Sequence, residues 1–253
     1  MASAAPPAGA LLARALRAVA AAPLGVLAPP LCWSCAGPAR RGEPLCGRCR
    51  GSLQRPAAEP VSLSGVTVWA PVAYAGPARD LVRALKFRGA RAVADAMAAQ
   101  IAANAPPGLL EAGIAPRGRA SSLARPTLVP VPLHPRRLRS RGYNQAGEIA
   151  RALALRTGLA VSDCLARLGA AATQVGRDRG ERRAGPAGAI VVRQHPCTDA
   201  PCMDARCTDA PARAVLVDDV VTTGATLAAC RAALLAAGSC DVGAVVFART
   251  LGR

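Results

Sequence analysis

The chain of 253 residues is 52% hydrophobic, only 2% aromatic, and has a formal net charge of +17 at pH 7. This length and apolar content exclude a disordered chain and allow a sizeable core, in one large domain or in a small and a medium one. The charge predicts binding of phosphates or polyanions, whereas the few scattered aromatic residues do not favour a stacking platform for single-stranded bases.

Residues 1–28 contain no acidic residue and predict an amphipathic, partly helical lead-in. Arg14 and Arg17 interrupt the apolar run that a secretory signal needs, and Pro23 ends it short of the ~20 residues of a membrane span. We therefore expect no membrane span and a cytoplasmic protein, with a transit peptide as the alternative.

Two CxxC pairs, CWSC and CGRC, lie within residues 29–60. Each pair can present two thiolates from one turn, and two such turns complete a tetrahedral sulfur shell. Two disulfides are the alternative, which the lack of a convincing secretory signal disfavours. The spacing predicts a knuckle with a structural zinc ion held by Cys32, Cys35, Cys46 and Cys49.

Residues 61–112 predict a strand and connecting helices. The segment PVAYAGPARDLVRALKFRG reads as a strand followed by a helix, with a break near Gly89 and an Ala-rich second helix. Lys86 is the only lysine of an arginine-rich chain, which indicates a site that needs an ammonium group; a chance surface lysine is the alternative.

The third region, residues 113–253, opens with an arginine-rich linker and a strand at 127–131 that Pro130 and Pro132 stop. A binding loop should follow, and then a helix that Asn144 caps and that ends before Gly158. Because arginine forks suit phosphate oxygens, the candidates for anion binding in the loop are Arg136, Arg137 and Arg141, with solvated surface charges as the alternative. In the same loop His134 could donate a proton or act only as a hydrogen-bond partner.

Charged residues without an apolar period fill residues 167–188, which predicts a mobile flap. A strand at 189–192 precedes an insertion at 194–211, where three pentapeptide repeats carry Cys197, Cys202 and Cys207. This insertion is either a metal site with His195 or, as tandem repeats suggest, an expanded loop. The remaining cysteines, Cys164, Cys230 and Cys240, are expected in the core.

The stretch VLVDDVVTTGATL, from Val215 to Leu227, carries the most specific chemistry. A buried strand over 215–217 leads to two acids, whose carboxylates accept hydrogen bonds from vicinal sugar hydroxyls. The turn that follows leads into a helix from Ala225, where backbone N–H groups and the helix dipole favour an anion. An ordinary strand-to-helix turn is the alternative. The stretch predicts a ribose-phosphate site made by Asp218, Asp219, Val220, Thr222, Thr223, Gly224, Ala225 and Thr226.

This stretch resembles the phosphoribosyl-pyrophosphate signature of the type I phosphoribosyltransferase fold. Together with VPVPLHPRRLRSRGYNQAGEIARAL, LKFRG and the cysteine pairs, the chain resembles the ComF family, named for a competence protein of DNA uptake. The resemblance implies an α/β fold: a type I phosphoribosyltransferase-like parallel sheet flanked by helices, with a small N-terminal zinc knuckle. It also implies that the acids hold the ribose hydroxyls, the turn holds the 5′-phosphate and the arginine loop holds pyrophosphate.

Two functions follow from these patterns. The first is a phosphoribosyltransferase that binds phosphoribosyl pyrophosphate with Mg²⁺ and serves an unknown acceptor, with Asp218, Asp219, Arg136 and Arg141 as its catalytic residues. The alternative is a non-catalytic protein of DNA uptake that binds single-stranded DNA, and partner proteins of that process, on the same scaffold. The oligomeric state is not indicated by the sequence.

Overall fold

The computed structural model describes residues 30–111, 125–168, 190–193 and 210–251. They belong to two compact units, Met1–Ser52 and Leu53–Arg253. In the first unit the chain turns back on itself at a bridge between Leu31 and Pro38, and it ends in the short helix α2 (Gly47–Gly51). The lead-in lies outside the described residues.

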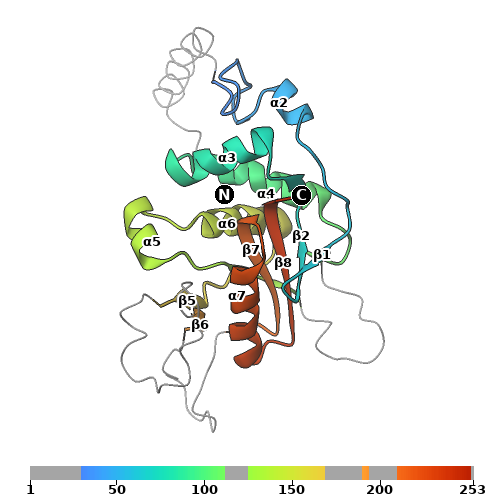
Figure 1. Ribbon diagram of the computed structural model, residues 1–253, viewed down its shortest axis with the longest axis vertical. Helices are drawn as coiled ribbons and strands as arrows, with labels where there is room; N and C mark the ends of the chain where they lie inside the picture. Colours follow the sequence, from blue (N-terminus) through green and yellow to red (C-terminus); the bar gives the residue numbers. More distant parts are fainter. Residues whose placement is uncertain (1–29, 112–124, 169–189, 194–209, 252–253) are drawn as a thin grey trace, which may run out of the picture. The chain divides into compact units, whose positions relative to one another are not determined.

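A six-stranded sheet forms the centre of the second unit. Its strands are β1 (Val61–Leu63), β2 (Val66–Trp69), β3 (Val72–Ala73), β4 (Thr127–Pro130), β7 (Arg213–Val221) and β8 (Asp241–Arg249). The order is β1-β2-β8-β7-β4, β3 also pairs with β8, and every pairing except β1 with β2 is parallel. Figure 1 shows β7 and β8 side by side in the middle of this unit.

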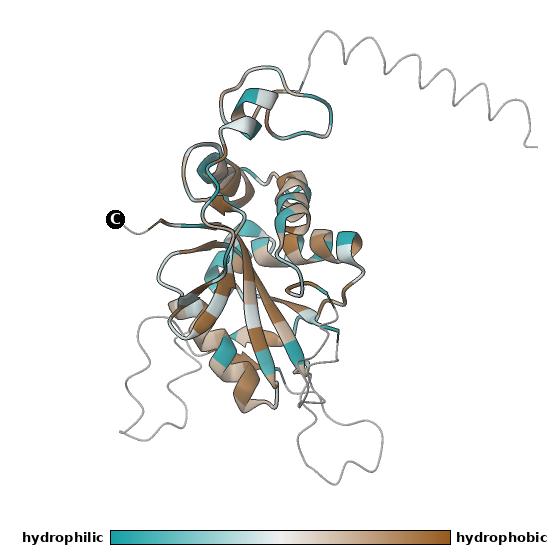
Figure 2. Cartoon of the chain, turned by 90° about the vertical axis from the view of Figure 1, so that its right-hand side faces the viewer, coloured by the Kyte–Doolittle hydropathy of each residue, from teal (hydrophilic) through white to brown (hydrophobic). Residues whose placement is uncertain are grey.

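Helices cover both faces of the sheet. On one side α6 (Gln145–Thr157) packs on β4 and β7, and α4 (Ala92–Asn104) packs on β8 and α6. On the other side α7 (Ala225–Ala236) packs on β2, β7 and β8. The apolar strands lie between these helices in Figure 2, as expected for a parallel sheet. The predicted α/β class, a mostly parallel sheet flanked by helices with a four-cysteine cluster near the N-terminus, is confirmed.

Local signals place the helix ends. The side chain of Asn144 accepts a hydrogen bond from the Ala146 N–H, and Gly158 ends α6 in the left-handed conformation, as predicted. The first predicted helix is α3 (Gly76–Phe87), and Gly89, with φ of 64°, separates it from α4. The predicted strand at 215–217 is longer in the structure, so both acids lie inside β7.

Two expectations are wrong. The arginine segment is not a loop but a helix, α5 (Pro135–Arg141), because His134 caps its start, Pro135 suits its first turn and Gly142 ends it with φ of 75°. Cys240 is exposed and not part of the core, because it lies in the turn before β8, whereas Cys164 and Cys230 are buried as expected.

A separate two-stranded antiparallel sheet joins β5 (Leu165–Arg167) and β6 (Ile190–Val192), which confirms the strand expected near 189–192. Most of the expected flap and nearly all of the cysteine-rich insertion lie outside the described residues. No helix in the described part of the chain is long and apolar enough to cross a membrane.

Candidate functional site

The aspartate pair lies near the end of the buried strand β7. Residues 214–217 are buried, and Asp219 is 4% exposed. Because side chains alternate along a strand, the two acids point to opposite faces of the sheet. Asp218 shares its face with Leu216, which packs with Leu227 and Leu234 of α7. Asp219 points instead toward α3.

Lys86, in the last turn of α3, forms an ion pair with Asp219. The Lys86 Nζ atom lies 2.9 Å from Asp219 Oδ1, and the lysine side chain is 26% exposed. Burial raises the pKa of Asp219, and the positive charges of Lys86 and Arg141 offset part of that rise. The single lysine of the chain therefore serves the second acid of the motif.

The environment of Asp218 is different. Burial, reinforced by the negative charge of Asp219, raises the pKa of Asp218 to about 7. The backbone N–H of Asp219 donates to Asp218 Oδ1 at 2.8 Å and offsets part of the rise. Burial thus raises the pKa of both neighbouring carboxyls near the end of β7.

The proposed phosphate turn connects β7 to α7. Thr222 and Thr223 are exposed, and the Thr223 hydroxyl accepts a hydrogen bond from the Ala225 N–H at 3.4 Å. Gly224, with φ of 83°, is the N-cap residue of α7 and has no side chain to cap the helix. Exposed hydroxyls beside the N-terminus of a twelve-residue helix suit an anionic ligand.

The β1–β2 hairpin braces this turn from behind. Its Ser64 hydroxyl donates to the Thr223 carbonyl at 2.9 Å. A Cβ atom on Gly224 would lie 2.9 Å from Leu63 Cβ, so only glycine fits the gap and the positive φ together. Ser64 and Leu63 were not among the predicted site residues, although the Ser64-Gly65 dipeptide is a turn signal in the sequence.

The three candidate arginines of α5 differ in their surroundings. Arg136 and Arg137 are exposed, as is Arg139. Arg141 is half-buried: its Nη1 atom donates to Gln145 Oε1 at 2.9 Å, and its Cζ atom lies 5.2 Å from the centroid of the Phe87 ring. Of the three candidates, Arg141 is therefore the one whose charge also acts on Asp219.

Two further residues of this segment have structural roles. His134 Nδ1 accepts from the Arg136 N–H at 3.2 Å, so His134 is a helix cap. Tyr143 is 8% exposed, its hydroxyl donates to the Leu85 carbonyl, and the Arg91 guanidinium covers its ring. The Tyr143 ring is thus packed in the fold.

A cavity of about 520 Å³ opens beside α5, near the start of α6 and the strand β5. Its charged lining residues are Arg91, Glu148, Arg151, Asp163, Arg167 and Arg193. Within the described part of the chain, none of the candidate aspartates, turn residues or α5 arginines lines it. The candidate site is therefore the open strand edge and not this cavity.

The four knuckle cysteines come together in the first unit. Their sulfur atoms all lie within 4.8 Å of one another, and the Sγ atoms of Cys35 and Cys46 are 3.7 Å apart. A tetrahedral zinc site with Zn–S bonds of about 2.3 Å places its sulfurs about 3.8 Å apart. The cluster therefore fits a structural zinc ion and could bind one.

The pKa values of two cluster thiols are shifted in opposite directions. Burial, which alone would raise the pKa of Cys32, is outweighed by backbone N–H groups of Cys35, Cys46 and Ser34, which lower it to about 6. Burial and the neighbouring cysteines raise the pKa of Cys49 to about 12. Four thiolates at this spacing would repel one another, and a bound cation would offset that repulsion.

No protein-family model and no curated protein matches the chain. Among solved structures, it is similar to two described as the analysis of an invariant aspartic acid in HPRTs, one a glutamic acid mutant and one an asparagine mutant. Both are 14% identical over 62% of this chain, with TM-scores of 0.29 and 0.30. The chain spans only 65% and 63% of these structures. The fold assignment rests on the strand order and the flanking helices.

Proposed function

We propose that the chain is a ComF-like phosphoribosyltransferase-family protein that binds phosphoribosyl pyrophosphate or a related ribose phosphate. The observation that carries the proposal is the structure that the stretch VLVDDVVTTGATL adopts. Its apolar half lies in the buried strand β7, its acids lie near the end of that strand, and its threonines lie at the turn and in the first turn of α7. Ligands of open α/β sheets bind at this edge.

Different residues of the candidate site bind different parts of the substrate. Asp218 and Asp219 accept hydrogen bonds from the ribose hydroxyls, while Thr222, Thr223, Thr226 and the N–H groups of the turn hold the 5′-phosphate. Arg141, with Arg136 and Arg137 toward solvent, stabilises the pyrophosphate group. Mg²⁺ would bind together with the diphosphate and would offset part of the charge on its oxygens.

In a transfer reaction the lone pair of an acceptor atom forms a bond to the anomeric carbon. The bond from that carbon to pyrophosphate breaks, and its electron pair leaves with pyrophosphate. The contribution of the chain is electrostatic, because carboxylates beside the ribose favour the positive charge of the sugar ring and arginines favour the departing anion. A zinc ion held by the four knuckle cysteines would stabilise the first unit.

Calorimetry with phosphoribosyl pyrophosphate and Mg²⁺ tests the proposal. We expect saturable binding that Asp219→Asn weakens and that the exposed-surface change Arg156→Gln leaves unchanged. Absence of binding at millimolar ligand would reject the site.

The exposure of Arg136, Arg137 and Arg139 on α5 favours a second function, binding of single-stranded DNA in DNA uptake. This version predicts salt-sensitive affinity for an oligothymidylate that falls when the three arginines are changed to glutamate. Unchanged affinity after this charge reversal would exclude α5 as the DNA-binding surface.

A further inference from the structure

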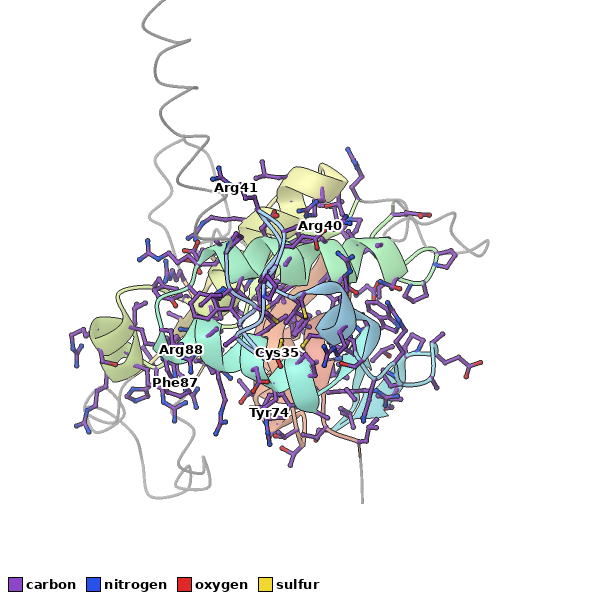
Figure 3. The ribbon with its side chains drawn as sticks, turned by 90° about the horizontal axis from the view of Figure 1, so that it is seen from above. Cys35, Arg40, Arg41, Tyr74, Phe87 and Arg88 are labelled. Carbon is purple, nitrogen blue, oxygen red and sulfur yellow. The ribbon has the colours of Figure 1, made fainter. Side chains whose placement is uncertain are left out.

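The cavity of about 520 Å³ beside α5 lies within the size range of small-molecule sites. The helix α5 contributes Pro135 and Leu138 to its wall, yet α5 has no buried residue and Leu138 is 42% exposed. Both Figure 1 and Figure 3 show α5 at the margin of the second unit, away from the central strands. The space beside α5 is therefore accessible to a ligand.

The wall of this cavity carries more positive than negative charge. Its described lining residues include four arginines and two acids, an excess of two positive charges. Both acids are already paired: Glu148 Oε1 lies 2.9 Å from Arg151 Nη1, and Asp163 Oδ2 lies 3.6 Å from Arg193 Nη1. The excess charge therefore belongs to the other two arginines, Arg91 and Arg167.

Arg91 and Arg167 form no salt bridge with any residue that the structure describes. Arg91 is held at the cavity wall by the Tyr143 ring, whose centroid lies 4.6 Å from the Arg91 Cζ atom. Arg167, in β5, is half-buried, and its Nε atom is buried with no hydrogen-bond partner among the described residues. A partly buried guanidinium without an acid partner carries a desolvation cost, which a bound anion would offset.

The remaining wall of the cavity is largely apolar. It is formed by Pro132, Leu133, Pro135, Leu138, Leu165 and Ala166. A ligand that fits both parts of the wall needs an anionic group and an apolar body. A phosphomonoester has a charge of about −1.5 to −2 at pH 7, which matches the excess charge of the two arginines, and its oxygens suit arginine forks.

We propose that this cavity is a second ligand site, which binds a phosphomonoester with an apolar body through Arg91 and Arg167. Its described lining residues include none of the residues assigned to the ribose, the 5′-phosphate or pyrophosphate. The proposal therefore goes beyond the ribose-phosphate function and does not depend on it.

Calorimetry of the full chain with phenyl phosphate tests the second site. Saturating ribose 5-phosphate is present, so that the phosphate turn is occupied. We expect phenyl phosphate to bind at least about fivefold more tightly than inorganic phosphate, because its ring buries apolar surface. Leu138→Ser should reduce this difference and leave the affinity for inorganic phosphate unchanged.

The arginine of β5 gives the decisive variant. Arg167→Gln should weaken phenyl phosphate about tenfold, because a charge-assisted contact to the phosphate is lost. The matched control is Arg139→Gln, which changes an exposed arginine of α5 outside the cavity wall and should have no effect. A thermal melting curve shows whether Arg167→Gln is folded; if it is not, Arg91→Gln replaces it with the same expected loss.

Three results would overturn the second site. Displacement of phenyl phosphate by ribose 5-phosphate would place the probe in the phosphate turn. Equal losses in Arg167→Gln and Arg139→Gln would show that the probe responds only to the general positive charge of the chain. Equal affinity for phenyl phosphate and inorganic phosphate would show that the apolar wall takes no part. If ribose 5-phosphate itself does not bind, the ribose-phosphate function fails, whereas phenyl phosphate binding that depends on Arg167 still supports the cavity.

Discussion

The hydroxyl of Ser64 donates a hydrogen bond to the carbonyl of Thr223 at 2.9 Å, although the two residues are 159 positions apart. The bond joins the tip of the β1–β2 hairpin to the proposed phosphate turn. Ser64→Ala should lower ribose 5-phosphate affinity about two- to fivefold, because a single partly exposed hydrogen bond contributes about 0.5–1 kcal/mol. Calorimetry measures the affinity; a matched change at another exposed serine, Ser140→Ala, should have no effect.

Gly224→Ala should damage the same turn more severely. An alanine there has a strained positive φ, worth about 1–2 kcal/mol, and its methyl group also meets Leu63 Cβ at 2.9 Å. We expect a lower free energy of unfolding in urea and loss of ribose 5-phosphate binding. Gly238→Ala is the matched control, since Gly238 has φ of 101° but open space around it. If the two variants behave alike, the close approach of Leu63 has no role.

Lys86→Met should leave the buried Asp219 carboxylate without its partner. We expect a loss of about 1–3 kcal/mol in stability, less than for a fully buried pair because Lys86 is 26% exposed. The double variant Lys86→Met/Asp219→Asn should regain part of this loss in a double-mutant cycle. Additive losses would show that the two side chains do not interact in solution.

The free energy of unfolding should depend on pH through the titration of Asp218. Because its pKa is raised from 3.8 to about 7, the folded chain binds more protons than the unfolded chain between these values. The free energy of unfolding contributed by this group therefore falls as pH rises from about 4 to about 7 and stays low above. Asp218→Asn should flatten the profile and be the more stable protein at pH 8. Urea titrations across this range measure the slope, and an unchanged slope in the variant contradicts the assignment.

Purified protein should contain one zinc ion per chain, bound by the four knuckle cysteines. Cys46→Ser should release the metal, whereas Cys240→Ser, which changes an exposed cysteine outside the cluster, should retain it. Elemental analysis after dialysis gives the stoichiometry. Equal zinc content in the two variants would place the metal elsewhere.

The sequence predicted best what depends on neighbours in the chain. Asn144 and Gly158 mark the ends of α6 because capping is local, and the apolar run of β7 is recognisable because it is buried on both faces. The dense charge of the α5 arginines predicts a loop, whereas the local signals of Pro135 and Gly142 form a helix. Charge density reports solvation and not backbone conformation.

Contacts between segments that are distant in the chain could not be predicted from the sequence. The arginine-rich composition made Lys86 stand out, but nothing in the sequence named Asp219 as its partner. The contact of Gly224 with Leu63 likewise exists only once β1 and α7 have met in the folded sheet. The sequence predicted the candidate site residues, but it did not predict the residues that contact them in the fold.

The two aspartates of the motif are adjacent in the chain but belong to different layers of the protein. Asp219 is tied through Lys86 to α3, and the charge of Asp218 reaches Cys230 within α7 on the opposite face. A sugar bound by both carboxylates would therefore connect the helices on one face of the sheet with α7 on the other face. Replacing Asp218 with asparagine and replacing Asp219 with asparagine therefore affect different layers of the protein. Neither aspartate can substitute for the other.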